Sequence, residues 1–142
     1  MTIGIGSDHA GFELKENIKR FLMEKGFSVT DYGTDSPDVS VDYPDIARLV
    51  CDNVLSGDCA FGVLCCGTGI GMSIAANRLG GIRAANCNDI FSAKMARAHN
   101  DANVLSLGSR ILAAGLACEI LSVFLETKFE GGRHQTRVDK LQ

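Results

Sequence analysis

The stretch that decides the fold is residues 60–78, which read AFGVLCCGTGIGMSIAANR. Its first seven residues form an unbroken apolar run, which is typical of a central parallel strand buried on both faces. Three glycines follow within five residues, and a helix-like pattern then begins. The stretch therefore predicts a strand, a tight turn and a helix, because parallel strands need crossover connections of this kind.

Similar strand–helix pairs occur along the rest of the chain. Strands are predicted at 2–6, 27–33, 60–66, 82–87 and 103–108, and helices at 11–26, 44–55, 70–78, 88–99 and 112–128. The aspartate-rich segment 34–42 is predicted to be a loop, and the tail after the two glycines at 131–132 can restart as a short helix. Five such units predict an α/β fold, a Rossmann-like, doubly wound, five-stranded parallel sheet, in a single domain spanning residues 1–142.

Composition excludes several classes of protein. The 142 residues are 46 % hydrophobic and carry a net charge of −3, which argues against nucleic acid or an acidic membrane as a partner. No apolar run approaches the ~20 residues of a membrane span, and Asp8 and His9 interrupt any signal peptide. The six cysteines show no CxxC spacing, so we expect reduced thiols, no metal site and a cytoplasmic location.

Polar residues follow the predicted strands at their carboxyl ends, where ligands bind in such sheets. Asp8 and His9 follow the first strand and Cys66 ends the third, while Asn86 and Asn88 flank the end of the fourth, and Ser109 and Arg110 follow the fifth. His99 and Asn100 are exceptions because they precede the fifth strand. A helix end would have to bend back for them to join the others.

The glycine-rich turn has a physical role of its own. Gly67, Gly69 and Gly71 let the backbone turn tightly and approach a ligand closely. The amides that open the following helix favour negative charge, so a phosphate or an enolate oxygen would fit there. The turn has neither the glycine spacing of a dinucleotide site nor the lysine of a P-loop. A tight turn with no ligand is the alternative.

Cys66 differs from the other cysteines in its position. Residues 51, 59, 65, 87 and 118 are expected to be small core hydrophobes, and alternation places Cys65 and Cys66 on opposite faces of the strand. Cys66 lies at a helix start, where a thiolate is favoured and can serve as a base or nucleophile. A core role for Cys66 remains open at this point.

Arg133 and Arg137 are four residues apart, so on a helix they share one face. With His134 between them they suit a phosphate clamp, because guanidinium forks match phosphate oxygens. A solvated basic face is the alternative.

Several blocks of the chain, in order, resemble the ribose-5-phosphate isomerase type B family, which also contains the galactose-6-phosphate isomerase subunits. The blocks are GSDHAGFELK, DYGT, DYPD, CGTGIGMSIAAN, GIRAA, AHNDANVLSLGSR and EGGRHQTRVD. The resemblance implies an aldose–ketose isomerase, an intramolecular oxidoreductase, that interconverts ribose 5-phosphate and ribulose 5-phosphate through an enediolate with no metal or organic cofactor.

The resemblance also implies a role for each matching residue. Cys66 matches the base that carries a proton between C2 and C1, and His99 matches the residue that opens the sugar ring. Some branches have a glutamate where this chain has Met72, which cannot accept a proton, so the chain should depend on Cys66. Thr68 would move a proton between O1 and O2. The expected binding residues are Asp8, at the ring hydroxyls; Gly67, Thr68, Gly69, Ile70 and Gly71, at the enediolate; His9, Arg110, Arg133 and Arg137, at the phosphate; Asn100, at the sugar; and Tyr43, lining the site.

In this family the active site lies between two subunits, which implies a homo-oligomer, dimer or tetramer, with residues 131–142 contributing to phosphate binding. One alternative is an isomerase of a six-carbon sugar phosphate such as allose 6-phosphate or galactose 6-phosphate. Another is a flavodoxin-like binding module without catalysis, which the cysteines at 65–66 and the low aromatic content of 6 % disfavour.

Overall fold

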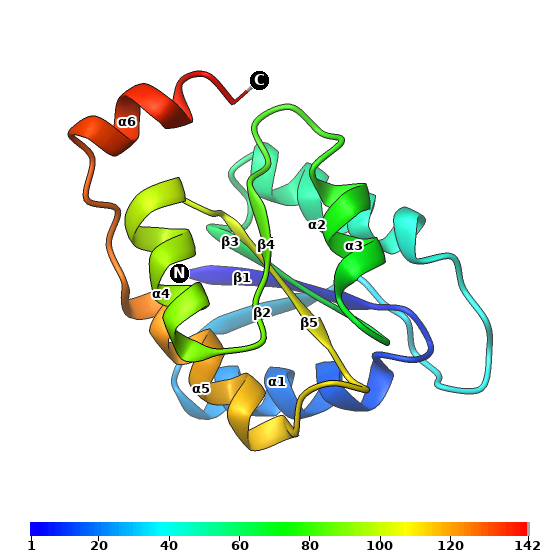
Figure 1. Cartoon of the computed structure of the whole chain (residues 1–142). Helices are drawn as coiled ribbons and strands as arrows, with labels where there is room; N and C mark the ends of the chain where they lie inside the picture. The colour runs from blue at the N-terminus through cyan, green and yellow to red at the C-terminus, as the bar shows by residue number, and fades with distance from the viewer. Residues whose placement is uncertain (142) are drawn as a thin grey trace.

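The structure, a computed structural model, describes residues 1–141. Five strands alternate with helices, and a sixth helix ends the chain (Figure 1). The strands are β1 Thr2–Ser7, β2 Ser28–Asp31, β3 Phe61–Cys66, β4 Ala84–Asn86 and β5 Val104–Gly108. The helices are α1 Phe12–Glu24, α2 Tyr43–Leu55, α3 Ile70–Ala76, α4 Ile90–Asn100, α5 Ala114–Glu126 and α6 Arg133–Val138.

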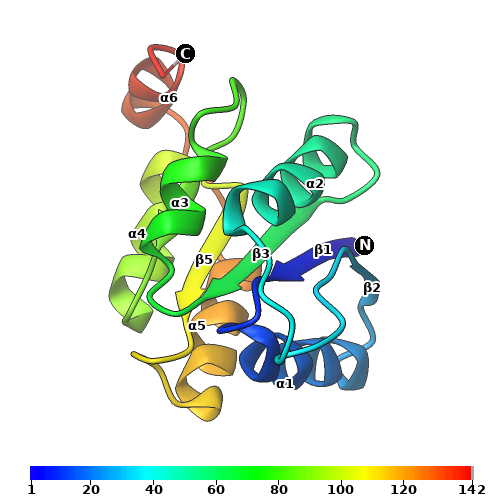
Figure 2. The ribbon, with the colours of Figure 1, turned by 90° about the vertical axis from the view of Figure 1, so that its right-hand side faces the viewer.

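The five strands form one all-parallel sheet in the order β2-β1-β3-β5-β4. Helices cover both of its faces (Figure 2). The larger core cluster joins the sheet to α1, α4 and α5, and the smaller one joins it to α2 and α3. The predicted single-domain, doubly wound α/β fold is confirmed, although β4 is only three residues long.

Chain direction places the predicted site residues at two different edges of the sheet. From β1 the chain goes to β2 on one side and to β3 on the other, so the residues after β1 and β3 meet at a topological switch point, where ligands bind in such sheets. Each crossover helix runs back against the strands. The end of α4 therefore lies where the strands begin, and α6 packs beside it (Figure 1).

A buried lysine fixes the loop that borders the switch point. Lys15 is fully buried, and its Nζ donates to both carboxylate oxygens of Asp31 at 2.8 Å and to the carbonyl of Thr34 at 2.9 Å. Burial alone would raise the pKa of Asp31, but hydrogen bonds from Lys15 and Lys19 outweigh it and lower that pKa. The network holds the start of loop 34–42 against the end of β1.

No helix among residues 1–141 has the length and apolar character needed to cross a bilayer.

Candidate active site

The two cysteines that end β3 belong to different faces of the sheet, as predicted. Cys65 lies in the larger core cluster, where burial raises the pKa of its thiol. Cys66 lies at the margin of the smaller cluster and is 4 % exposed. The backbone N–H of Gly69 donates to the Cys66 Sγ at 3.1 Å. Because an N–H aimed at sulfur stabilises negative charge there, Cys66 is the member of the pair suited to proton transfer.

Each backbone carbonyl from Cys66 to Gly69, in the glycine-rich turn, accepts a hydrogen bond from a neighbouring segment. Ser106 Oγ donates to the Gly69 carbonyl at 2.6 Å, and Asn86 Nδ2 donates to the Thr68 carbonyl at 3.3 Å. Two backbone bonds complete the set, from Ser109 N to Cys66 O at 2.8 Å and from Arg110 N to Gly67 O at 2.9 Å. Strand β5 supplies or precedes three of these four donors, because the strand order places it beside β3.

A hydrogen bond to a carbonyl also fixes the direction of the amide that follows it, since a trans peptide points its N–H opposite to its C=O. The N–H of Gly69 is used by the sulfur, and that of Ile70 donates to Thr68 Oγ1 at 3.3 Å. Within residues 1–141, the amides of Gly67, Thr68 and Gly71 have no hydrogen-bond partner. The turn is therefore a preorganised set of donors beside a thiol, suited to a developing oxyanion.

Gly69 and Gly108 make this turn possible. Gly69 has φ of 79°, a conformation that favours glycine, and it is the N-cap residue that precedes α3. A Cβ on Gly108 would lie 2.6 Å from the backbone of Thr68, so only a glycine in β5 allows the turn to lie this close.

Asp8 and His9 follow β1 at the same edge of the sheet. The buried carboxylate of Asp8 accepts the N–H of Gly11 at 3.0 Å through Oδ1, which supports the start of α1. His9 Nδ1 accepts the N–H of Val41 at 3.3 Å, so the neutral ring carries its proton on Nε2. A cavity of about 470 Å³ is lined by His9, Ser109 and Arg110. A ring N–H and a guanidinium can both donate to a phosphate there.

Tyr43 and Arg110 border the glycine-rich turn. A Cβ on Gly71 would lie 2.8 Å from the Tyr43 ring, and one on Gly67 would lie 3.4 Å from the Arg110 guanidinium. The predicted residues Asp8, His9, Tyr43, Cys66, Thr68, Ile70 and Arg110 therefore gather at the carboxyl edge. Cys66 itself is not in the wall of any of the three described cavities.

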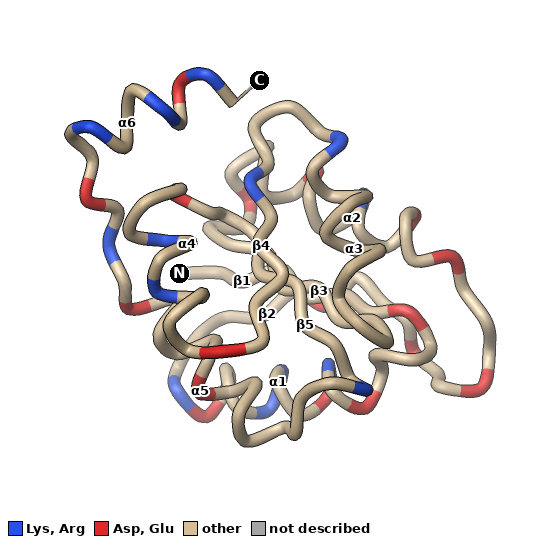
Figure 3. Tube along the Cα trace, viewed as in Figure 1, with Lys and Arg blue, Asp and Glu red and all other residues tan. Residues whose placement is uncertain are grey.

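His99, Asn100 and Arg137 do not join that group. They line a separate cavity of about 310 Å³ at the edge where the strands begin. The end of α4 does not bend back toward Cys66. The register pairs Cys66 with Gly108, four residues beyond Val104, so the strands alone separate the two edges by about 13 Å. Arg133 and Arg137 do share the short helix α6, whose basic residues Figure 3 shows.

His99 has two neighbours that the sequence did not reveal. Its ring stacks on His134, with centroids 4.1 Å apart and planes 11° apart, and Glu130 lies beside both rings. In the described chain these are the one group of three side chains placed closely enough to hold a metal ion. No periodicity connects residues 99 and 134, so only the tertiary fold brings them together.

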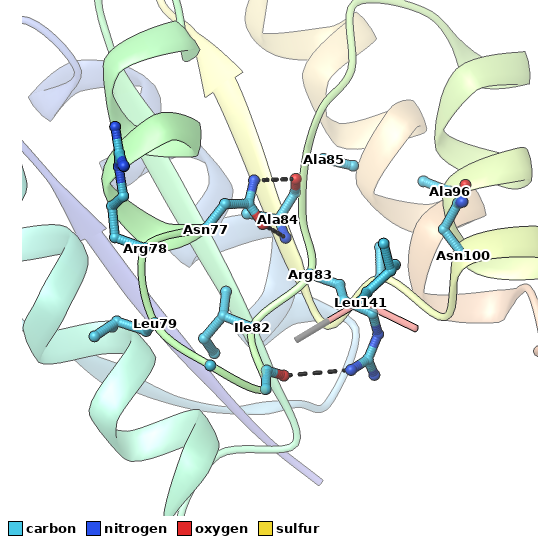
Figure 4. A pocket seen from close by; sticks show the side chains of 13 residues that line it. Asn77, Arg78, Leu79, Ile82, Arg83, Ala84, Ala85, Ala96, Asn100 and Leu141 are labelled. Carbon is cyan, nitrogen blue, oxygen red and sulfur yellow. Dashed lines mark hydrogen bonds between the residues drawn. The ribbon is translucent and has the colours of Figure 1, made fainter. Parts of the chain in front are cut away.

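A further cavity, of about 490 Å³, lies between the end of α3 and the end of α4 (Figure 4). The side-chain amide of Asn77 exchanges two hydrogen bonds with the backbone of Ala84 at its wall, at 2.9 and 2.8 Å. Among the described residues, Asn100 is the one predicted site residue that lines this cavity. The cavity therefore lies beside the edge where the strands begin and not beside the carboxyl edge that holds Cys66.

The sequence and the fold together match known proteins. The model of the Ribose/Galactose Isomerase family matches residues 3–141. The chain belongs to this family. A family member, ribose-5-phosphate isomerase B of Escherichia coli, is 47 % identical over 139 residues, which cover 98 % of this chain and 93 % of the relative.

Other members carry related names. D-erythrulose-4-phosphate isomerase of Pectobacterium atrosepticum is 43 % identical over 141 residues, which cover 99 % of this chain and 93 % of the relative. The crystal structure of a ribose 5-phosphate isomerase from Thermotoga maritima superposes with a TM-score of 0.97 at 54 % identity, covering 99 % of this chain and 96 % of that one. The resemblance noted from the sequence is thereby confirmed, and a flavodoxin-like binding module has no support.

Proposed function

We propose that this chain interconverts D-ribose 5-phosphate and D-ribulose 5-phosphate through an enediolate, with no metal or organic cofactor. The observation that carries the proposal is the pairing of the Cys66 thiol with the unoccupied amides of Gly67, Thr68 and Gly71. A carbon acid next to a carbonyl is weak, so stabilising the oxyanion supplies much of the catalysis, and one such donor is worth about 3 kcal/mol.

The proposed chemistry moves one proton on carbon and one on oxygen. The Cys66 thiolate removes the proton from C2 of the open-chain aldose, and the electron pair moves to O1 to give the enediolate. The same thiol returns the proton to C1. The Thr68 hydroxyl moves a proton between O1 and O2, which leaves a carbonyl at C2. Asp8 contacts the sugar hydroxyls, and Tyr43 lines the site beside the turn.

Ring opening and part of phosphate binding come from the other edge of the sheet in this proposal. His99 opens the furanose ring, Asn100 contacts the sugar, and Arg133 and Arg137 bind the phosphate together with His9 and Arg110. Because one chain separates these groups from Cys66, the proposal requires a homodimer or a larger homo-oligomer in which residues 131–142 of one copy complete the site of another. Gln142, the last residue of that segment, lies outside the described residues.

The cellular setting is part of the proposal. All six thiols are free in the structure, which suits the reducing cytoplasm. Ribose 5-phosphate and ribulose 5-phosphate place the reaction in the pentose phosphate pathway.

A six-carbon sugar phosphate, such as allose 6-phosphate or galactose 6-phosphate, is the second candidate class. Both His99 and the Arg133–Arg137 pair occur in one chain, which favours a self-sufficient homo-oligomer over a pair of different subunits. The test is a coupled assay that compares kcat/KM for ribose 5-phosphate and allose 6-phosphate. A preference for ribose 5-phosphate supports the proposal, and a preference for the six-carbon substrate or no turnover of either overturns it.

A further inference from the structure

The surroundings of His99 are more specific than a helix end requires. The ring of His99 lies flat against that of His134, at a centroid distance of 4.1 Å. Glu130 Oε2 lies 3.8 Å from His99 Nε2 and 3.4 Å from His134 Nε2. The backbone N–H of Glu130 donates to the carbonyl of Ala98 at 3.0 Å, which holds the main chain of Glu130 beside the end of α4.

The surroundings of His134 disfavour the charged form of its ring. His134 is buried, and that burial, together with the charges of His99, Arg133 and Arg137, lowers its pKa, while Glu130 acts in the opposite direction. The surroundings of His134 therefore favour its neutral form. The charged groups that act on His134 are Glu130, from the preceding coil, and Arg133 and Arg137, from α6.

The cluster is a poor metal site despite its composition. Stacked rings with planes only 11° apart direct their nitrogen lone pairs side by side, whereas two ligands of one metal ion must converge on it. Two guanidinium groups nearby also oppose a further cation. The same arrangement suits a proton that is held on one imidazole and stabilised by one carboxylate.

On the basis of the proposed function, we propose that His134 and Glu130 are positioning residues for the opening of the sugar ring by His99. The step breaks the C1–O4 bond, removes a proton from O1 and delivers one to O4, so atoms and charge balance without another reactant. His134 holds the plane of the His99 ring by stacking. Glu130 stabilises the imidazolium when His99 carries the proton.

The experiment compares two substrates that differ in their need for ring opening. Ribose 5-phosphate forms a furanose, whereas erythrose 4-phosphate carries its phosphate on O4 and has no furanose ring. The variants are His134→Ala, His134→Phe and Glu130→Gln, with His99→Asn as the reference for lost ring opening. Thr136→Ala, at an exposed position of the same helix, is the matched control.

His134→Ala should lower kcat/KM for ribose 5-phosphate about tenfold and leave that for erythrose 4-phosphate within about twofold, because positioning acts only on the first step. His134→Phe should recover most of the loss, since it keeps the stacking. Glu130→Gln should move the acidic limb of the ribose 5-phosphate profile to lower pH by about half a unit. Equal losses on both substrates, or no loss on either, would overturn the inference.

Nuclear magnetic resonance tests the same arrangement without turnover. The chain has three histidines, so single replacements assign every imidazole signal. His134→Ala should move the His99 signal downfield, because it removes the ring current of the stacked imidazole. Tight Zn²⁺ binding that is lost in His134→Ala would instead show that the cluster is a metal site. If the wild-type protein turns over neither sugar phosphate, but its His99 signal still responds to replacement of His134, the proposed function is wrong and the stacking of the two rings is still correct.

Discussion

In the proposed mechanism, the two edges of the sheet carry different halves of the chemistry. At the carboxyl edge, a thiol, a set of unoccupied amides, Asp8 and His9 meet at the point where β1 and β3 end. At the opposite edge, two stacked imidazoles and the basic helix α6 surround a cavity of about 310 Å³. The first edge can stabilise an oxyanion and move a proton on carbon, and the second can bind an anion and move a proton on oxygen.

Parallel topology explains why one chain keeps these halves apart. Each helix returns across the sheet, so a residue at a helix end lies at the opposite edge from a residue at a strand end. The proposal requires a second copy of the chain to bring its α4–α6 edge to the Cys66 edge of the first. The proposed function therefore requires two copies of the chain to assemble, and the following changes test each edge in turn.

The largest effect is expected at the carboxyl edge, from Cys66→Ala. Removing the base should lower kcat by about a thousandfold or more, because positioned general bases contribute on that scale. Turnover measured by a coupled assay and folding measured by circular dichroism check this result.

The matched control is Cys65→Ala, the adjacent cysteine on the other face of the sheet. Cys65 is buried in the core, so the change should lower the free energy of unfolding. Burial also raises the pKa of its thiol, which makes it a poor base, so most of the activity should remain. A similar loss in both variants would mean that Cys66 acts only through packing.

A smaller effect is expected at the opposite edge, from Arg137→Ala. Loss of a charge-assisted bond to the phosphate should raise KM by roughly tenfold to a hundredfold and leave kcat within about threefold. Lys140→Ala, another exposed cation near the end of α6, is the control and should change little. An unchanged KM for Arg137→Ala would show that Arg137 does not bind the substrate phosphate.

Ser106→Ala tests the ties that orient the glycine-rich turn. Without the 2.6 Å bond to the Gly69 carbonyl, the peptide that joins Gly69 to Ile70 and the turn before it lose part of their support, so kcat should fall about tenfold while KM stays within about twofold. The free energy of unfolding should fall by only about 1 kcal/mol. Steady-state kinetics and urea unfolding, with Ser122→Ala on α5 as control, distinguish this from a general loss of folding.

The smallest effect is expected from a chelator. The proposed chemistry uses a thiol, amides and imidazoles, so prolonged treatment with EDTA should leave kcat/KM for ribose 5-phosphate unchanged. Activity that falls on chelation and returns with a divalent cation would give the His99–Glu130–His134 cluster a different role.

Much of the first edge could be predicted from the sequence, and much of the second could not. Apolar runs and glycine turns locate the strands, and the rule that ligands bind beyond strand ends then selects Asp8 and Cys66. The ties from Asn86 and Ser106 depend on which strands are neighbours, which no local pattern encodes. The stacking of His99 on His134 depends on how the tail packs across α4, and the distance between the edges depends on the direction of each crossover.

A heterodimer measures the central claim most directly. Cys66→Ala and the double variant His99→Asn/Arg137→Ala would be co-expressed with different tags, and the mixed dimer would be purified through both. If each site uses Cys66 of one copy and α4–α6 of the other, the mixed dimer has one intact site and should show about half of the wild-type activity per dimer. A mixed dimer as inactive as its two parents would contradict the shared site.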